Sequence, residues 1–166
     1  MDERKIALDL DGTLVSRGWT TEDPPIIDHA LLQQLKDEGI TRIDICTNQA
    51  GIMFGFRSGD SFIKVIDWLS RVAYNDYGIE IGLLLVSLYH PKAKLDLIEQ
   101  RNTVAELLID TCGLRFDIFT TEEHRKPNPT MLTLCGCTEY WGDSPEDEQA
   151  ALAAGKTHKQ VEEFEK

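Results

Sequence analysis

The stretch KIALDLDGT, residues 5–13, decides the fold of this chain of 166 residues. Its first half is a short apolar run, which predicts a buried strand, and the run ends in Asp9, Asp11 and Gly12. Residues i and i+2 of an extended chain face the same way, so both carboxylates would project together beyond the strand, and glycine would let the backbone turn. Two carboxylates about 5 Å apart repel by roughly 3 kcal/mol at an effective dielectric near 20. Such a pair indicates a cation site or acid–base chemistry, although spacing alone favours a solvated Asp-Gly turn.

Strands and helices alternate along the rest of the chain. Short apolar or alternating runs predict strands over 5–10, 41–47, 81–88, 116–120 and 138–141. Helical spacing predicts helices over 27–38, 61–74, 96–111, 128–134 and 144–154. This order is typical of an α/β fold, a Rossmann-like three-layer sandwich with a mostly parallel sheet. We expect one domain over residues 1–166, with its site at the carboxyl ends of the strands.

Two of those strand ends can bind an anion. Thr47, Asn48 and Gln49 stand at the end of the second strand, where a hydroxyl and two amides can hold an anion without adding charge. Arg125 and Lys126 stand before Pro127 at a helix start; an arginine can grip phosphate with two hydrogen bonds, and a lysine acts as a point charge. Taken alone, each segment is equally typical of an ordinary turn.

The last strand end adds a third carboxylate, Asp143. Ser144 reads as a helix N-cap, Pro145 as the first helical residue, and Asp147 as the capping-box partner, so Asp147 has a structural explanation and Asp143 has none. Three carboxylates mutually about 5 Å apart would repel by roughly 10 kcal/mol in total. Such a cluster favours a divalent cation, and ligation by oxygen alone suits magnesium.

The four segments, in this order, resemble the motifs of the haloacid dehalogenase (HAD) superfamily of phosphoryl-transfer enzymes. The resemblance runs from Ile6 to Gly155, and residues 47–52 and 125–129 are similar to a subgroup that includes histidinol-phosphate, heptose-bisphosphate and polynucleotide 3′-phosphatases. Several members of this subgroup carry a zinc loop with clustered Cys and His, which this chain lacks, so no zinc is expected. Residues 14–26 are too few for a large cap, and the segment after Gly155 is short, so we expect an essentially capless fold with a reduced or absent last strand.

The resemblance implies a role for each motif residue. Asp9 would be the nucleophile that forms an aspartyl-phosphate, and Asp11 the general acid and base. Thr47 would bind a phosphoryl oxygen, and Lys126 would neutralise developing charge. Mg²⁺ would be held by the Asp9 side chain, the backbone carbonyl of Asp11, and the Asp143 side chain.

Substrate contacts are less well marked. Asn48 and Arg125 are the candidates for substrate binding. Arg17 and Arg57 are weaker ones, and a solvated surface position is favoured for both. Trp19 is expected to serve packing rather than recognition.

Composition limits the partners. The net charge is −12, which weighs against nucleic acid, and no apolar run is long enough to span a membrane. The N-terminus does not read as a secretory signal, and four cysteines are too few for a disulfide scaffold, so we expect a cytoplasmic protein. Zinc at Cys135 and Cys137, with Cys112, His90 or His124 as distant partners, is disfavoured.

The leading hypothesis is a magnesium-dependent phosphomonoesterase that acts on a small phosphorylated metabolite of the sugar-phosphate or histidinol-phosphate type. A polynucleotide 3′-phosphatase and a non-catalytic relative of the same fold are the alternatives.

Overall fold

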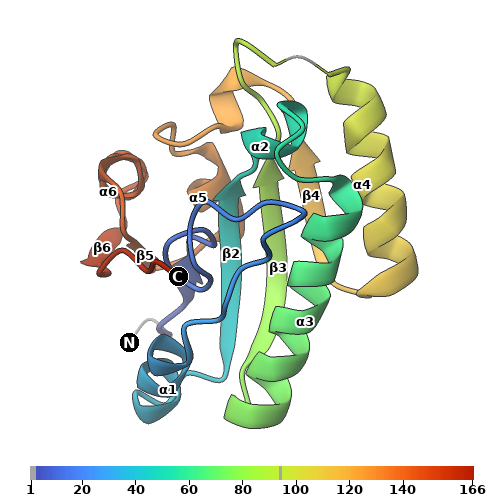
Figure 1. The fold of residues 1–166 in the computed structure, drawn as a ribbon. Coiled ribbons are helices and arrows are strands. Elements are labelled where there is room, and N and C mark those ends of the chain that lie inside the picture. The colour runs from blue at the N-terminus through green and yellow to red at the C-terminus, as the bar shows by residue number, and fades with distance from the viewer. Residues whose placement is uncertain (1–2, 94) are drawn as a thin grey trace.

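The computed structural model describes residues 3–93 and 95–166, which form a six-stranded, all-parallel sheet in the order β4-β3-β2-β1-β5-β6 (Figure 1). The strands are β1 (Ile6–Leu8), β2 (Arg42–Asn48), β3 (Glu80–Ser87), β4 (Arg115–Phe119), β5 (Glu139–Gly142) and β6 (Thr157–Gln160). The helices are α1 (His29–Asp37), α2 (Ala50–Met53), α3 (Gly59–Tyr77), α4 (Leu97–Thr111), α5 (Thr130–Cys135) and α6 (Pro145–Ala153), with a 3-10 turn at Glu122–His124.

The register of the central strands sets the position of the site. β1 pairs on one side with β2 and on the other with β5, and Leu8 stands opposite both Ile45 and Trp141. The strand order reverses direction at β1, because the chain runs outward to β4 on one side and to β6 on the other. The residues that follow β1, β2 and β5 therefore meet at one edge, which is where parallel sheets bind their ligands.

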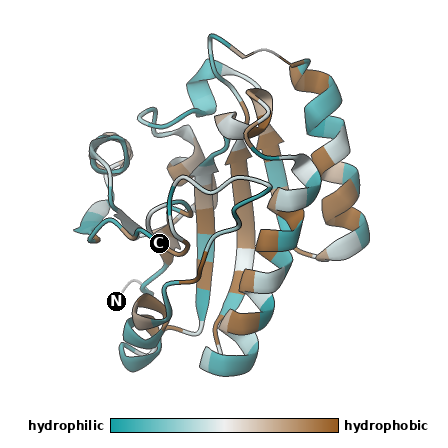
Figure 2. Cartoon of the chain, in the orientation of Figure 1, coloured by the Kyte–Doolittle hydropathy of each residue, from teal (hydrophilic) through white to brown (hydrophobic). Residues whose placement is uncertain are grey.

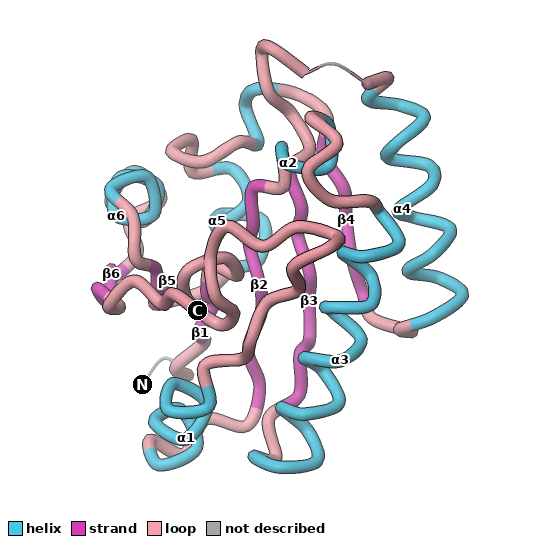
Figure 3. Tube along the Cα trace, viewed as in Figure 1, coloured by secondary structure: helices cyan, strands magenta, loops and turns pink. Residues whose placement is uncertain are grey.

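Helices cover both faces of the sheet. The larger core cluster joins one face to α1, α3 and α4, whose buried contacts include Leu32, Phe62 and Leu108. The smaller cluster joins the other face to α5 and α6 through Met131 and Ala150. Figure 3 shows the central strands with helices around them, and Figure 2 shows that the central strands are largely hydrophobic.

The predicted strands and helices are confirmed, with bounds that shift by one to three residues. Two elements were not predicted, α2 and β6. The last strand was expected to be reduced or absent; β6 is present and short, with four residues at the edge of the sheet. The connection from β1 to α1 holds only isolated bridges at Val15, which agrees with an essentially capless fold.

Lys94, expected to open the helix in place of a zinc loop, lies outside the described residues. Over the part of the chain that is described, no helix has both the length and the apolar character needed to cross a membrane.

Candidate active site

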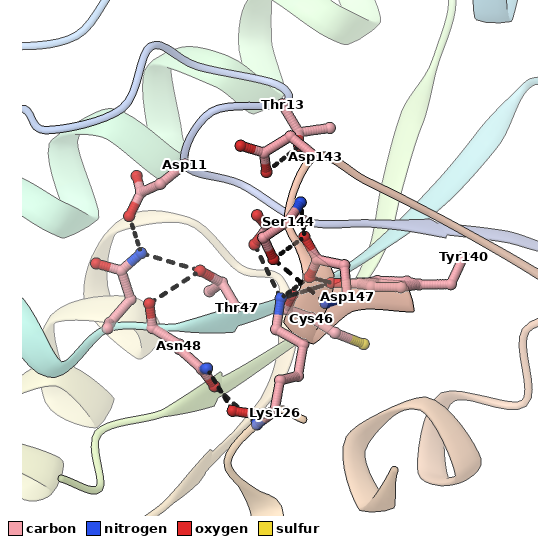
Figure 4. Close-up of polar contacts among 12 residues, drawn as sticks. Asp11, Thr13, Cys46, Thr47, Asn48, Lys126, Tyr140, Asp143, Ser144 and Asp147 are labelled. Atoms are coloured by element: carbon pink, nitrogen blue, oxygen red, sulfur yellow. Dashed lines mark hydrogen bonds and ion pairs between the residues drawn. The ribbon is translucent and has the colours of Figure 1, made fainter. Parts of the chain in front are cut away.

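The segments that follow β1, β2, β4 and β5 enclose a cavity of about 180 Å³. Figure 4 shows these segments converging, with Lys126, Tyr140 and Asp147 close together and Asp11 set apart from them. The residues that line the cavity are Asp9, Asp11, Arg17, Asn48, Lys126, Asp143, Ser144, Glu146 and Asp147. Five of the seven predicted site residues are therefore at one place. Thr47 is fully buried beside it, and Arg125 precedes Lys126 in the chain.

Lys126 is the centre of a buried hydrogen-bond network. Its ammonium lies within hydrogen-bond distance of four oxygens, which share its three N–H groups: Asp9 Oδ1 (3.0 Å), Asp147 Oδ1 (2.7 Å), the Tyr140 hydroxyl (2.6 Å) and the Cys46 carbonyl (3.0 Å). Burial disfavours the ammonium, but the two carboxylates overcome this and raise the pKa of Lys126 above its ordinary value. The side chain therefore stays charged while only 3% exposed.

Asp9 and Asp147 share this lysine but titrate differently. Burial raises the pKa of Asp9 well above its ordinary value, against the opposing effect of Lys126, with Asp147 and Asp11 raising it further. Burial would also raise the pKa of Asp147, but the charge and hydrogen bond of Lys126 outweigh it and leave that pKa lowered. Lys126 is therefore the counter-ion of both carboxylates, and its ammonium lies closer to Asp147 (2.7 Å) than to Asp9 (3.0 Å).

Asp147 also caps helix α6, as the sequence predicted. Its Oδ2 accepts from the backbone N–H and the hydroxyl of Ser144, and the Ser144 hydroxyl accepts from the Asp147 backbone, which completes the capping box. The other oxygen, Oδ1, faces Lys126. The Asp147 carboxylate thus caps the helix with one oxygen and binds Lys126 with the other. The capping pattern in the sequence predicted the first contact and did not indicate the second.

The carboxylates that approach one another are Asp9, Asp143 and Asp147. One oxygen from each lies within 4.8 Å of the others, and among the described residues no other set of His, Cys, Asp and Glu meets this distance. Thr13 donates to Asp143 Oδ1 (3.3 Å), and burial raises the pKa of Asp143. The expected third side chain of this cluster was Asp11, and Asp147 lies there in its place.

The Asp11 carboxylate is held by a different group of residues. Its Oδ1 accepts from the Trp19 indole (2.7 Å), and its Oδ2 accepts from the Gln49 amide (3.0 Å) and the Arg57 guanidinium (2.8 Å). The expectation that Arg57 would be a solvated surface residue is wrong, because it is only 8% exposed and stacks on Trp19 with 3.7 Å from its Cζ to the ring centroid. Trp19 is likewise more than a packing residue.

The two candidate substrate contacts are already engaged. The Asn48 side chain donates to the Lys126 carbonyl and accepts from the Lys126 backbone N–H, each at 3.1 Å, so it fixes the segment that carries the lysine. The Arg125 guanidinium donates to the Tyr89 carbonyl (3.0 Å). Thr47 accepts from Gln49 (3.0 Å) beneath the cavity.

Arg17 lies at the rim of the cavity and is more than half exposed. It forms an ion pair with Glu163, and its backbone N–H donates to the Phe164 carbonyl (3.1 Å). The Phe164 N–H in turn donates to the Gly12 carbonyl (2.8 Å). The final segment of the chain therefore packs along the loop that carries Asp11.

Comparison with known proteins gives relatives of one kind. D-glycero-beta-D-manno-heptose-1,7-bisphosphate 7-phosphatase from Yersinia pestis is 30% identical over 162 residues, which cover 90% of this chain and 74% of that protein. No family model matches the chain.

Two solved structures share the fold. A protein from Mesorhizobium loti, described as a HAD-like phosphatase, aligns with a TM-score of 0.66 at 21% identity, covering 92% of this chain and 69% of its own. D,D-heptose 1,7-bisphosphate phosphatase from B. bronchiseptica, solved with magnesium and phosphate, aligns with a TM-score of 0.65 at 20% identity, covering 96% of this chain and 80% of its own.

Proposed function

This chain belongs to the HAD-like phosphatases related to heptose-bisphosphate phosphatase, and we propose that it hydrolyses a small phosphate monoester through an aspartyl-phosphate formed on Asp9. The observation that carries the proposal is the placement of Asp9: its carboxylate lines a small cavity, bound to a buried ammonium and beside two further carboxylates. Phosphoryl transfer depends mostly on positioning and charge neutralisation, and this site supplies both.

The proposed reaction has two steps. In the first, an Asp9 oxygen attacks phosphorus, the bond to the leaving oxygen breaks with its electron pair, and Asp11 gives that oxygen a proton. In the second, water attacks the aspartyl-phosphate, Asp11 takes a proton from the water, and Asp9 is released with inorganic phosphate. Lys126 holds Asp9 in place and neutralises charge, and Thr47 donates to a phosphoryl oxygen.

The residues present fit a magnesium ion. Asp9, Asp143 and Asp147 offer oxygens within 4.8 Å of one another, which is the donor chemistry that Mg²⁺ prefers. Gly12 leaves room for Asp143, because a Cβ built on it would come within 2.5 Å of Asp143 Oδ2. We propose that Asp9, Asp143 and the Asp11 backbone carbonyl hold the ion, with Asp147 nearby. A bound magnesium would supply positive charge to the phosphoryl oxygens.

The size of the cavity supports a small substrate. A volume of about 180 Å³ has room for a phosphoryl group and part of a small ester, and the rest of the ester would extend toward the rim, where Arg17 and Glu146 stand. The Yersinia pestis relative is named for a phosphatase acting on a heptose bisphosphate. We propose a sugar phosphate or histidinol-phosphate type of substrate, with Asn48 and Arg125 on the phosphate side, and a cytoplasmic reaction, in keeping with four free cysteines.

The test is phosphate release from a panel of esters with added magnesium: p-nitrophenyl phosphate, sugar phosphates, histidinol phosphate and a 3′-phosphorylated oligonucleotide. Asp9→Asn should abolish release with an unchanged circular dichroism spectrum, while Asp110→Asn, an exposed position on α4, should retain it. Activity undiminished in Asp9→Asn would refute the proposal. A preference for the oligonucleotide that weakens steeply with salt would favour the polynucleotide 3′-phosphatase. Failure on the whole panel would favour a non-catalytic relative.

A further inference from the structure

We infer that Arg57, acting with Gln49 and Trp19, is a positioning device that directs one particular oxygen of Asp11, Oδ1, toward the leaving group. This inference rests on the proposed function, because it concerns how Asp11 performs the proton transfer assigned to it there.

The Asp11 carboxylate has one hydrogen-bond acceptor site that its neighbours leave open. An ionised carboxylate has about four lone-pair sites, two on each oxygen. Oδ2 of Asp11 accepts two hydrogen bonds, from Gln49 (3.0 Å) and Arg57 (2.8 Å), so both of its sites are used. Oδ1 accepts one, from Trp19 (2.7 Å). The remaining site on Oδ1 is therefore the one that can carry the transferred proton, on a carboxylate that lines the cavity.

The groups that donate to Asp11 are themselves fixed by other hydrogen bonds. Arg57 Nη1 also donates to Gln49 Oε1 (2.9 Å), which leaves the NH₂ end of Gln49 to face Asp11. The same NH₂ group donates to Thr47 (3.0 Å), so the amide is bound at both ends. Arg57 Nη2 donates to the Trp19 carbonyl (2.8 Å), and the guanidinium stacks on the Trp19 ring. None of these groups can turn without breaking another contact.

The buried position of the Arg57 guanidinium costs free energy. Arg57 is 8% exposed, and its Nε is buried with no hydrogen-bond partner among the described residues. A buried, incompletely satisfied guanidinium is expensive, and a fold that needed only packing would be as well served by an apolar side chain of the same volume. The hydrogen bond from Arg57 to Asp11 explains why the charged side chain stands there.

The experiment compares two substrates that depend differently on a general acid. An alkyl phosphate has a poor leaving group and needs the proton, whereas p-nitrophenyl phosphate has a good leaving group and needs it little. Loss of a general acid costs about 10²–10⁴-fold. Asp11→Asn should therefore lower kcat for the alkyl ester far more than for the aryl ester.

Arg57→Met keeps the length of the side chain and removes its donors, and it should lower kcat for the alkyl ester at least about tenfold more than for the aryl ester. Trp19→Phe removes only the donor to Oδ1 and keeps the aromatic ring. It should therefore shift the ratio of kcat for the alkyl ester to kcat for the aryl ester, and it provides a second test if Arg57→Met does not fold. Arg71→Met, which removes an exposed arginine from α3, is the control and should leave the ratio unchanged.

The double variant Arg57→Met/Asp11→Asn decides between positioning and general damage. If Arg57 acts through Asp11, the double variant should be no slower on the alkyl ester than Asp11→Asn alone. Equal losses on both esters, an added loss in the double variant, or a faster alkyl reaction in Arg57→Met would each overturn the inference. These outcomes leave the proposed function intact, whereas a wild-type protein that hydrolyses neither ester would remove both.

Discussion

Replacement of Lys126 by methionine tests whether the buried network stabilises the fold as well as the reaction. The lysine ammonium is the shared counter-ion of Asp9 and Asp147 and donates to two further buried oxygens. Methionine fills a similar volume without charge. The variant would therefore leave two carboxylates facing each other in a site from which water is largely excluded.

The magnitude follows from the geometry. The Asp9 and Asp147 oxygens lie within 4.8 Å of each other, so two unit charges there repel by about 3.5 kcal/mol at an effective dielectric of 20. Removal of one partner from a buried ion pair typically costs about 3–5 kcal/mol. For a domain of this size each kcal/mol lowers the melting temperature by about 2–4 °C. We expect Lys126→Met to melt roughly 7–14 °C below the wild type at pH 7.

The deficit should depend on pH in a defined direction. In the wild type, Lys126 lowers the pKa of Asp147, so this pair stabilises the fold above the ordinary carboxyl pKa and the benefit is lost as the pH falls. In Lys126→Met the anionic forms of Asp9 and Asp147 would be destabilised in the folded protein. Both carboxyls would take up a proton as the pH falls, and the repulsion between them would then disappear. The difference between the two melting temperatures should thus begin to narrow above the ordinary carboxyl pKa of about 4, where the variant's carboxyls take up protons, and should narrow further below it, where the wild type loses the Asp147–Lys126 pair.

Differential scanning calorimetry without added magnesium provides the measurement. Lys64→Met, which removes one partner of an exposed pair on α3, is the matched control and should change stability by less than about 1 kcal/mol. A Lys126→Met protein that melts within 2 °C of the wild type would refute the electrostatic reasoning. So would a deficit that widens as the pH falls.

Three further outcomes can be measured on the same protein. Gly12→Ala should lose more stability and more magnesium affinity than Gly18→Ala. Both glycines have a positive φ, but only at Gly12 would the added Cβ meet Asp143, 2.5 Å from its Oδ2. Calorimetric titration with magnesium compares the affinities of the two variants. Magnesium at a hundred times its dissociation constant should stabilise the wild type by about 2.7 kcal/mol, and Asp143→Asn should abolish most of that shift in a thermal melt. Glu163→Gln frees Arg17 at the rim, and it should lower KM for esters with a second anionic group while kcat stays the same; an unchanged KM would count against a substrate role for Arg17.

The parts of the fold that the sequence predicts are those in which neighbouring residues act together. The apolar run before Asp9 makes a central strand, and the cap at Ser144 begins a helix, because both effects operate within a few residues. β6 escapes prediction because its four residues are polar and mostly exposed, at the sheet edge, where no alternation is required. Its position depends on pairing with β5 and not on its own pattern.

The site divides in the same way. The motif carboxylates follow strands that the sequence pattern marks, Lys126 stands in the loop after β4, and the fold brings them together. Arg57 does not stand at a strand end, and nothing in its neighbourhood distinguishes it from an exposed arginine. Its partner Asp11 lies 46 positions away in the chain. Such a contact exists only once β1, β2 and the start of α3 are assembled, so composition and spacing could not reveal it.

The carboxylates of Asp9 and Asp11 stand two residues apart in the chain, but each is paired with a different cation. Asp9 is bound to Lys126 from the loop after β4, and Asp11 to Arg57 from the loop before α3. Within the site, four carboxylates (Asp9, Asp11, Asp143 and Asp147) face these two cations, which leaves a formal charge of −2. One divalent cation would neutralise that charge. Because Arg57 reaches the site only through its ion pair with Asp11, its charge offsets that carboxylate, and its effect on the reaction should be lost once Asp11 is replaced by asparagine.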